Sequence, residues 1–126
     1  MYGLTKTIAR EKEDPNQPVV HDLFETDLVE ITETEDLDGE ILALTLDDLD
    51  ERREFGEKKY GVPLQPFDGN RPMVEAFQEV LDAAIYLRQA LVEEYSLDRD
   101  AIYLDCVKLL FRIRGILWWE DRGRRG

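Results

Sequence analysis

At 126 residues, the chain is long enough for one domain with a modest hydrophobic core. Its formal net charge of −13 argues against general binding to nucleic acid or to acidic membranes, and its single cysteine cannot form an internal disulfide, which fits a reducing cytoplasm. No apolar run reaches membrane-spanning length and the N-terminus lacks a signal-peptide core, so we expect a soluble cytoplasmic protein with no membrane partner and no direct contact with DNA.

The N-terminal part of the chain divides into a mixed arm and a strongly acidic stretch. Residues 1–21 contain two prolines and no sustained period, which predicts a flexible arm. Residues 22–51 contain thirteen acids and no Lys or Arg. Within this stretch, the β-prone runs 29–32 and 40–46 flank a turn signal and permit a short β-hairpin, although leucine and alanine in the second run would also suit a helix.

Capping signals predict two helices after this stretch. Thr45 and Asp48 resemble a capping box at the start of the first, which ends at Gly61, where a left-handed cap is natural. After a loop with two prolines, Asn70 can cap the second helix, and Pro72 suits its first turn.

A third predicted helix is very apolar and begins at Ser96 or Asp98. Gly115 is expected to end or bend it, and residues 119–126 to form a frayed basic tail. We therefore expect a single helical domain over residues 22–118, preceded by the arm and followed by the tail.

The central predicted helix, residues 72–95, is apolar over most of its circumference. One face carries Met73, Phe77, Val80, Ala84, Leu87 and Leu91. A narrow strip carries polar side chains instead: Glu75, Glu79, Asp82 and Tyr86. Carboxylates between apolar flanks are unfavourable unless a positive group lies against them, and a divalent metal ion is the simplest such group. A helix apolar on several sides also needs more partners than a short chain supplies, which predicts self-association.

A second acidic stripe lies on the preceding predicted helix, and antiparallel pairing would bring the two stripes together. If Glu54 lies opposite Glu79, the same register places Glu51 opposite Asp82 and joins two i, i+3 carboxylate pairs. Four carboxylates without cations would repel one another, whereas oxygen-rich clusters of this kind suit Mg²⁺ or Mn²⁺. A shift of one turn would instead recruit two neighbours, Glu57 and Glu75. Solvated faces and surface salt bridges are the alternative interpretation of such carboxylates.

Several short strings around these carboxylates occur together between about residues 46 and 94. In order, they are Lys59-Tyr60-Gly61, Pro63-Leu64-Gln65, Gly69-Asn70-Arg71, Glu79-x-x-Asp82 and Tyr86-Leu87-Arg88-Gln89. This span resembles the small phage and bacterial MazG-like nucleotide pyrophosphohydrolases, whose superfamily has an E-x-x-E motif followed after a gap by E-x-x-D. Here Glu51-x-x-Glu54 or Glu54-x-x-Glu57 matches the first half, with 24 or 21 residues before Glu79-x-x-Asp82.

The resemblance implies an all-α fold in which helices of different subunits complete four-helix bundles, as homodimers or homotetramers. It implies hydrolysis of a (deoxy)nucleoside triphosphate, with a lean toward a purine deoxynucleotide such as dGTP or dATP, to the monophosphate and pyrophosphate. Mg²⁺ or Mn²⁺ would be held by Glu51, Glu54, Glu79 and Asp82. If the chain is phage-encoded, it would act in the host cytoplasm. The acidic 22–51 region and the apolar third helix have no counterpart in this resemblance.

Other polar residues of the two helices receive expected roles by position. A carboxylate not fully engaged by metal, Glu54 or Glu57, could accept the proton of the attacking water. Contacts with the substrate are expected from Lys58, Lys59, Arg71, Glu75 and Tyr86. The alternative for the three cations is that each is simply solvated. For Glu75 it is a salt bridge to a nearby cation, and for Tyr86 it is a packed side chain. His21 is expected to be incidental in a loop, and Cys106 to be a core residue.

A different class of function stays open beside the enzyme. A non-enzymatic acidic interaction protein, such as an inhibitor that mimics the charge of nucleic acid, would spread its acids over an exposed face and need no ion. With one histidine and no Gly-rich phosphate loop, the chain can build neither a Ser-His-Asp triad nor a Walker-type site.

Overall fold

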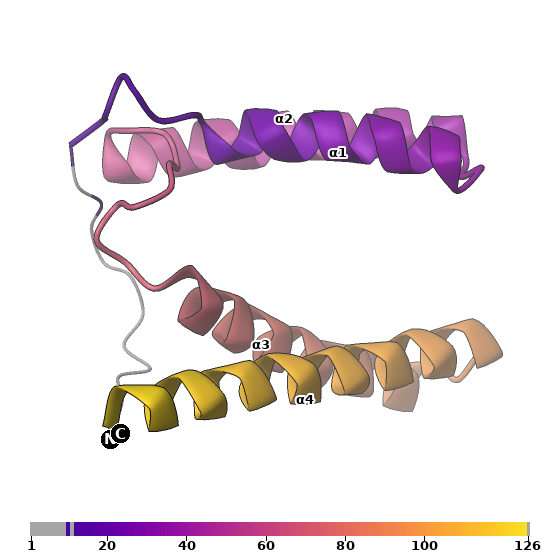
Figure 1. Cartoon of the computed structure of the whole chain (residues 1–126). Coiled ribbons are helices and arrows are strands. Elements are labelled where there is room, and N and C mark those ends of the chain that lie inside the picture. The colour runs from indigo at the N-terminus through magenta and orange to yellow at the C-terminus, as the bar shows by residue number, and fades with distance from the viewer. Residues whose placement is uncertain (1–9, 11, 126) are drawn as a thin grey trace. The chain divides into compact units, whose positions relative to one another are not determined.

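A computed structural model describes residue 10 and residues 12–125, and α-helices make up the regular structure of this part of the chain (Figure 1). In chain order they are α1 (Val20–Thr34), α2 (Gly39–Tyr60), α3 (Pro72–Glu93) and α4 (Leu97–Arg125). The described residues contain no strand, so the predicted all-α class is confirmed. No helix within the described ranges is long and apolar enough to cross a bilayer.

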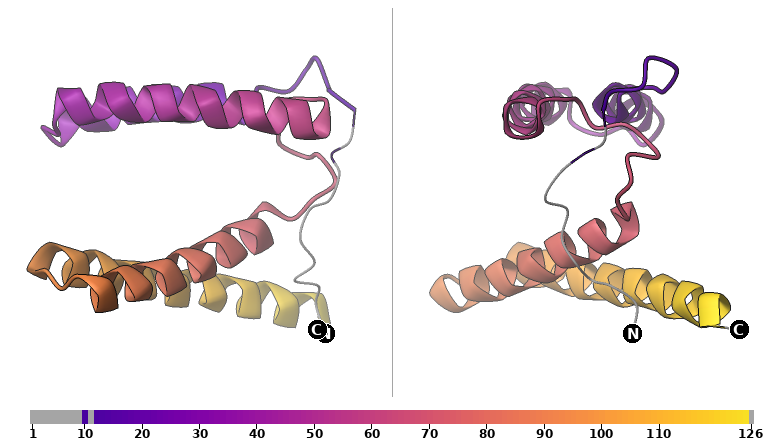
Figure 2. Two further views of the ribbon diagram at one scale, coloured as in Figure 1. Left: turned by 180° about the vertical axis from the view of Figure 1, so that it is seen from behind. Right: turned by 90° about the vertical axis from the view of Figure 1, so that its left-hand side faces the viewer.

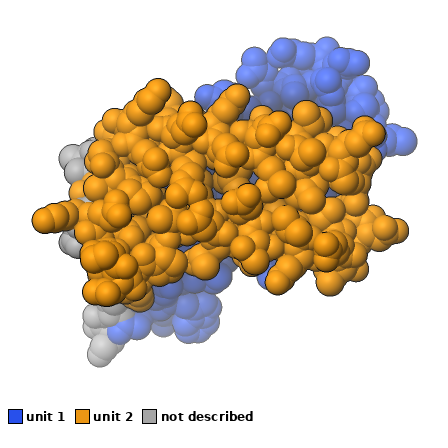
Figure 3. Space-filling view, turned by 90° about the horizontal axis from the view of Figure 1, so that it is seen from above, with its two compact units in different colours: residues 1–7, 71–126 blue, residues 8–70 orange. Residues whose placement is uncertain are grey.

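The helices form two compact units, each made of two helices that are neighbours in the sequence (Figure 3). Among the described residues, residue 10 and residues 12–70 form the unit with α1 and α2, and residues 71–125 form the unit with α3 and α4. We call these the α1–α2 unit and the α3–α4 unit. In each unit the two helices run antiparallel and pack against each other across a short connection (Figure 1 and Figure 2).

The β-hairpin predicted within residues 29–46 is wrong, because both of its runs are helical. Asp38 caps α2 instead, and its carboxylate accepts a hydrogen bond from the backbone N–H of Glu40 over 2.8 Å. Thr32 in the first run donates its hydroxyl to the carbonyl of Leu28, one turn earlier, over 2.6 Å. The turn signal therefore joins two helices rather than two strands.

The ends of α2 agree only in part with the predicted caps. Thr45, predicted to start the helix, lies inside it and donates its hydroxyl to the carbonyl of Ile41 over 2.7 Å. At the other end, Gly61 has a φ of 79° and its N–H donates to the carbonyl of Glu57 over 2.7 Å. This is the predicted left-handed cap, a conformation that glycine adopts without steric strain.

The α3–α4 unit has a small core along the seam between its helices. Val74 of α3 and Ile113 and Leu117 of α4 are buried, and the partly buried side chains that pack against them are Met73, Ala76, Phe77 and Val80. Cys106 is half-buried at the same seam, where its Sγ lies 3.7 Å from the carbonyl oxygen of Val80.

The caps of α3 and α4 refine the predicted boundaries. The N-cap of α3 is Arg71 rather than Asn70, because Asn70 turns back and donates its N–H to the carboxylate of Asp68 over 3.1 Å. Before α4, the Ser96 hydroxyl accepts the N–H of Arg99 over 3.0 Å, so of the two predicted starts, Ser96 and Asp98, the first is the cap.

The predicted tail is wrong as far as the described residues reach, because α4 continues through Gly115 to Arg125. Part of the predicted arm lies outside the described residues, since residues 1–9 and 11 are not among them. The domain boundaries predicted at 22 and 118 stay predictions.

Candidate functional site

The carboxylates predicted on the central helix lie on an accessible strip of α3. Glu79 and Asp82 are exposed one helical turn apart, and Tyr86 extends the strip by a further turn with 68% of its surface exposed. Glu75, at the N-terminal end of the strip, is half-buried. A ligand approaching this side of α3 would meet two carboxylates and an aromatic ring.

The second carboxylate stripe lies on α2, and its members differ in their surroundings. Glu51 and Glu54 are exposed one turn apart. Glu57, one turn further on, is half-buried, and the Nε of Arg53 donates to its Oε1 over 3.1 Å. The same guanidinium donates through Nη1 to the carboxylate of Asp22 in the first turn of α1. Arg53 therefore joins α1 to α2 and engages one of the candidate motif carboxylates.

A charged cluster surrounds this contact, which we call the Arg53 cluster and define as Arg10, His21, Asp22, Arg53 and Glu57. The hydrogen bonds that Arg53 donates to Glu57 and Asp22 raise the pKa of its guanidinium, so its charge is retained. The pKa of His21 is lowered, first by burial and then by the positive charges of Arg53 and Arg10. The expectation that His21 lies incidentally in a loop is wrong, because it belongs to the first turn of α1.

The Arg53 cluster distinguishes the two alternatives for the E-x-x-E motif. Glu57 is held by Arg53, whereas no ion pair to Glu51 or Glu54 occurs among the described residues. A cation that bound Glu57 would have to share its carboxylate with the guanidinium or displace it. Glu51-x-x-Glu54 is therefore the pair whose two carboxylates are both exposed and lie outside the ion pairs of Arg53, and which pair binds a metal ion stays a prediction.

The predicted phosphate-binding cations have contrasting environments. Lys58 is exposed, and Lys59 is exposed with its Nζ 5.3 Å from the centre of the Tyr60 ring. Arg71 is half-buried at the start of α3, where its Nη2 lies 3.9 Å from a carboxylate oxygen of Glu120 in α4. Lys58 is thus the most accessible of the three cations to a phosphate group, whereas Arg71 also pairs with a carboxylate within the α3–α4 unit.

Four carboxylates have the donor chemistry that Mg²⁺ and Mn²⁺ prefer, and each of two helices offers one pair. In the described part of the chain, no three Asp, Glu, His or Cys side chains are grouped closely enough to hold a metal ion. One pair belongs to the α1–α2 unit and the other to the α3–α4 unit. A site built from both pairs requires a particular docking of α2 on α3, so the register that sets Glu54 opposite Glu79 stays a prediction.

Sequence reasoning missed the residue that anchors the loop between α2 and α3. Gln65 is buried, and its Oε1 accepts the N–H of Asp14 over 2.8 Å. Its Nε2 donates to the carbonyl oxygens of Asp14, over 2.8 Å, and of Gln17, over 3.0 Å. The signal in the sequence is its position between Pro63 and Pro66, in a loop with restricted backbone freedom.

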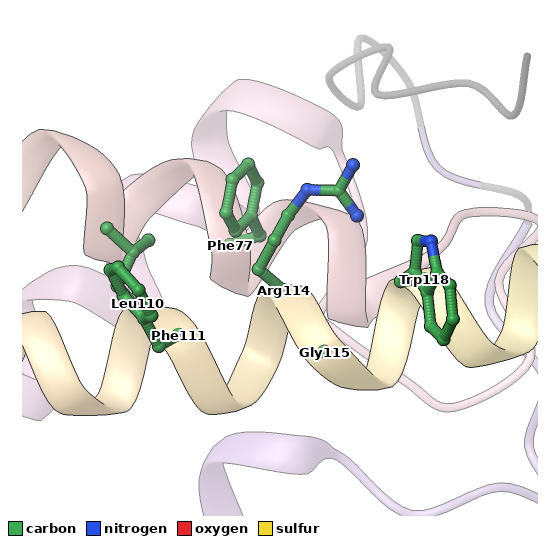
Figure 4. Close-up of a pocket in the computed structure, with 6 residues that line it drawn as sticks. All are labelled: Phe77, Leu110, Phe111, Arg114, Gly115 and Trp118. Atoms are coloured by element: carbon green, nitrogen blue, oxygen red, sulfur yellow. The ribbon is translucent and has the colours of Figure 1, made fainter.

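An apolar pocket of about 520 Å³ on the α3–α4 unit was also missed (Figure 4). It is lined by Phe77 of α3 and, from α4, by Leu110, Phe111, Arg114, Gly115 and Trp118. The Arg114 guanidinium lies 5.8 Å from the centre of the Phe77 ring. At about 100° per residue, Phe77 lies roughly 160° around α3 from Glu79 and about 140° from Asp82. The pocket and the carboxylate strip therefore occupy different sides of α3.

Comparisons with known proteins found no relative: no protein-family model matches the chain, and neither a curated protein nor a solved structure matches it.

Proposed function

We propose that this protein is a metal-dependent nucleotide pyrophosphohydrolase. It converts a (deoxy)nucleoside triphosphate, with preference for a purine deoxynucleotide such as dGTP or dATP, to the monophosphate and pyrophosphate. The observation that carries the proposal is the exposure of two carboxylate pairs, each one turn apart on a long helix: Glu51 and Glu54 on α2, and Glu79 and Asp82 on α3. The MazG-like strings around these pairs support it.

The proposed roles follow from the surroundings of each side chain. Mg²⁺ or Mn²⁺ bound by the two pairs would neutralise phosphate charge and lower the pKa of a bound water. We assign proton acceptance from the attacking water to Glu54 rather than Glu57, because Arg53 holds Glu57. Water attacks the α-phosphorus, and the bond to the bridging oxygen breaks so that this oxygen leaves with pyrophosphate. Exposed Lys58 is the first candidate for the β- and γ-phosphates.

The proposed active form is a homodimer or homotetramer. The α3–α4 unit buries few side chains, while large apolar residues on both units remain exposed. A second copy is the simplest way to cover such surfaces.

Two measurements test the enzyme. Mg²⁺ or Mn²⁺ should raise the melting temperature of the protein, and pyrophosphate should be released from a panel of nucleoside triphosphates. Glu79→Gln and Asp82→Asn should each abolish pyrophosphate release without loss of helix content. Glu93→Gln is the matched control, because it removes the same charge about 21 Å further along α3 at about 1.5 Å per residue. Full activity of both site variants would refute the proposal.

A specific observation also favours the non-enzymatic alternative. All thirteen acids between residues 22 and 51 are exposed, so the α1–α2 unit presents a strongly negative surface. A protein that works through this surface would bind a cationic partner without a divalent ion, release no pyrophosphate, and lose binding as salt is raised. The pyrophosphate assay therefore separates the two functions.

A further inference from the structure

α4 has two apolar sides, of which one packs against α3. Ile113 and Leu117 lie on the packed side and are buried. Roughly 140° around the helix, at about 100° per residue, Leu104, Phe111 and Trp118 recur at seven-residue intervals. These three residues remain exposed, Phe111 by 72%. We call them the outer seam of α4, and their spacing is that of a helix–helix contact.

The surface around the outer seam is hollowed and can accept side chains of a partner. The 520 Å³ pocket lies beside Phe111 and Trp118 (Figure 4). A second hollow further along the helix is lined by Val107, Lys108, Phe111 and Arg112. Gly115 lies between Phe111 and Trp118 and adds no side chain, which allows the backbone of a second helix to come close.

The outer seam is flanked by positive charge in an otherwise acidic chain. Residues 106–119 contain no Asp or Glu, and they carry Lys108, Arg112 and Arg114. One turn beyond Trp118, the Arg122 guanidinium stacks over its ring at 4.5 Å. An apolar seam with cationic flanks favours a partner that is apolar with acidic flanks.

α1 has the complementary pattern. Its exposed large apolar residues are Leu23, Phe24, Val29 and Ile31, and Phe24 and Ile31 are seven residues apart. The exposed acids Asp27 and Glu30 lie on the same side, and residues 22–51 contain no Lys or Arg. At about 1.5 Å per residue, the 15 residues of α1 span about 22 Å, which matches the roughly 21 Å from Leu104 to Trp118.

We propose that α1 of a second copy of this protein packs on the outer seam of α4, with its Phe24 and Ile31 against Phe111 and its acids against Lys108 and Arg112. A nucleic acid or an anionic membrane would also meet cations and aromatic rings here, but the net charge of −13 repels such extended polyanions. Every copy carries both surfaces, so the contacts can join copies into a dimer, a ring or an open chain. The inference does not depend on the proposed catalytic activity.

Analytical ultracentrifugation of the full chain tests the contact. Wild-type protein should self-associate at low salt and dissociate as salt is raised, because exposed charges are screened. Phe111→Asp should weaken self-association by at least about tenfold in Kd. Ile102→Asp is the matched control, since Ile102 is similarly exposed on the opposite side of α4 and should leave Kd within about threefold. Helix content by circular dichroism verifies that both variants fold.

Reversing the charges of the two surfaces tests whether α1 of a second copy is what binds the outer seam. One double variant, Lys108→Glu/Arg112→Glu, makes the flanks of the outer seam negative, and another, Asp27→Lys/Glu30→Lys, makes the matching surface of α1 positive. Each variant alone should fail to self-associate, because its two surfaces then carry the same sign of charge. Mixed together, the two variants should form a heterodimer, because each then meets a complementary surface. Wild-type protein that stays monomeric at low salt, or a mixture that does not associate, overturns the proposal. So does a monomer that binds single-stranded oligonucleotide or anionic vesicles in a manner lost in Phe111→Asp.

Discussion

Arg53 joins carboxylates from two helices, Asp22 of α1 and Glu57 of α2. Both carboxylates are more than a third exposed, so water screens each pair. We expect Arg53→Ala to lower the free energy of unfolding by about 1 kcal/mol in urea denaturation, since exposed ion pairs contribute about 0.5 kcal/mol each. Arg52→Ala is the control, because the Arg52 guanidinium stacks on the Phe55 ring at 4.8 Å without joining two helices. Equal losses in the two variants would contradict this account.

The lowered pKa of His21 makes stability depend on pH. In the unfolded chain the imidazole titrates near 6.5, whereas burial and the charges of Arg53 and Arg10 disfavour its charged form in the folded state. Between these two pKa values the unfolded state binds more protons, so the His21 contribution to stability, fully present above pH 6.5, is lost as pH falls through that window.

NMR titration measures this effect directly, because the chain has one histidine. The C2 proton of His21 should report a pKa below 6.5, and Arg53→Ala should raise that pKa. Replacing the imidazole in His21→Gln should remove part of the loss of stability between neutral and mildly acidic pH. A wild-type pKa at or above 6.5 would show that burial and the charges of Arg53 and Arg10 do not outweigh the carboxylates of Glu57 and Asp22.

Arg53 donates a hydrogen bond to Glu57 but not to Glu54, so replacing each glutamate should change the rate of pyrophosphate release to a different extent. Loss of a general base typically lowers the rate about 10²–10⁴-fold, so Glu54→Gln should lower pyrophosphate release by at least about 100-fold. Glu57→Gln should lower the rate less than about tenfold, because this carboxylate serves Arg53. The reverse ranking would move the catalytic motif to Glu54-x-x-Glu57.

At the scale of the helix, the same substitution should have opposite effects at two glycines. Gly61 ends α2 with a φ of 79°, so Gly61→Ala should destabilise the protein by about 1 kcal/mol. Gly115 is helical, and no atom of the described residues lies within 4 Å of a Cβ added there. Gly115→Ala should therefore stabilise the monomer by about 0.5–1 kcal/mol. Urea denaturation measures both, and a shared sign would refute the assigned conformations.

The sequence predicted helix boundaries well where a strong capping residue occurs, and poorly where packing between helices determines how far a helix extends. Gly61 and Ser96 mark helix ends as predicted. The acidic stretch was misread because threonines and β-branched residues favour strands locally, whereas Leu42, Leu46 and Leu49 recur at helical spacing and are half-buried in the α1–α2 unit. In α4, the predicted break at Gly115 fails because the buried seam continues on both sides of it, at Ile113 and Leu117.

For the whole molecule, the candidate site depends on a contact that local patterns do not specify. The i, i+3 spacing could predict the two carboxylate pairs and their helices, but not their register. α2 packs against α1 and α3 against α4, and each of these seams forms within its own unit. Convergence of Glu54 with Glu79 requires a docking between units, which neither seam determines.

The whole chain should become more stable as salt is raised at low protein concentration. Thirteen exposed acids between residues 22 and 51 repel one another, and the net charge is −13. The Debye length falls from about 30 Å at 0.01 M salt to about 8 Å at 0.15 M, which screens this repulsion. The melting temperature should therefore rise over this range, and it should rise less in Asp27→Asn/Glu30→Gln/Glu33→Gln, which removes three of the charges. Because the same salt weakens the proposed contact between copies, the rise should be measured on monomer. A fall in the melting temperature of that monomer would mean that ion pairs such as those of Arg53 outweigh the repulsion.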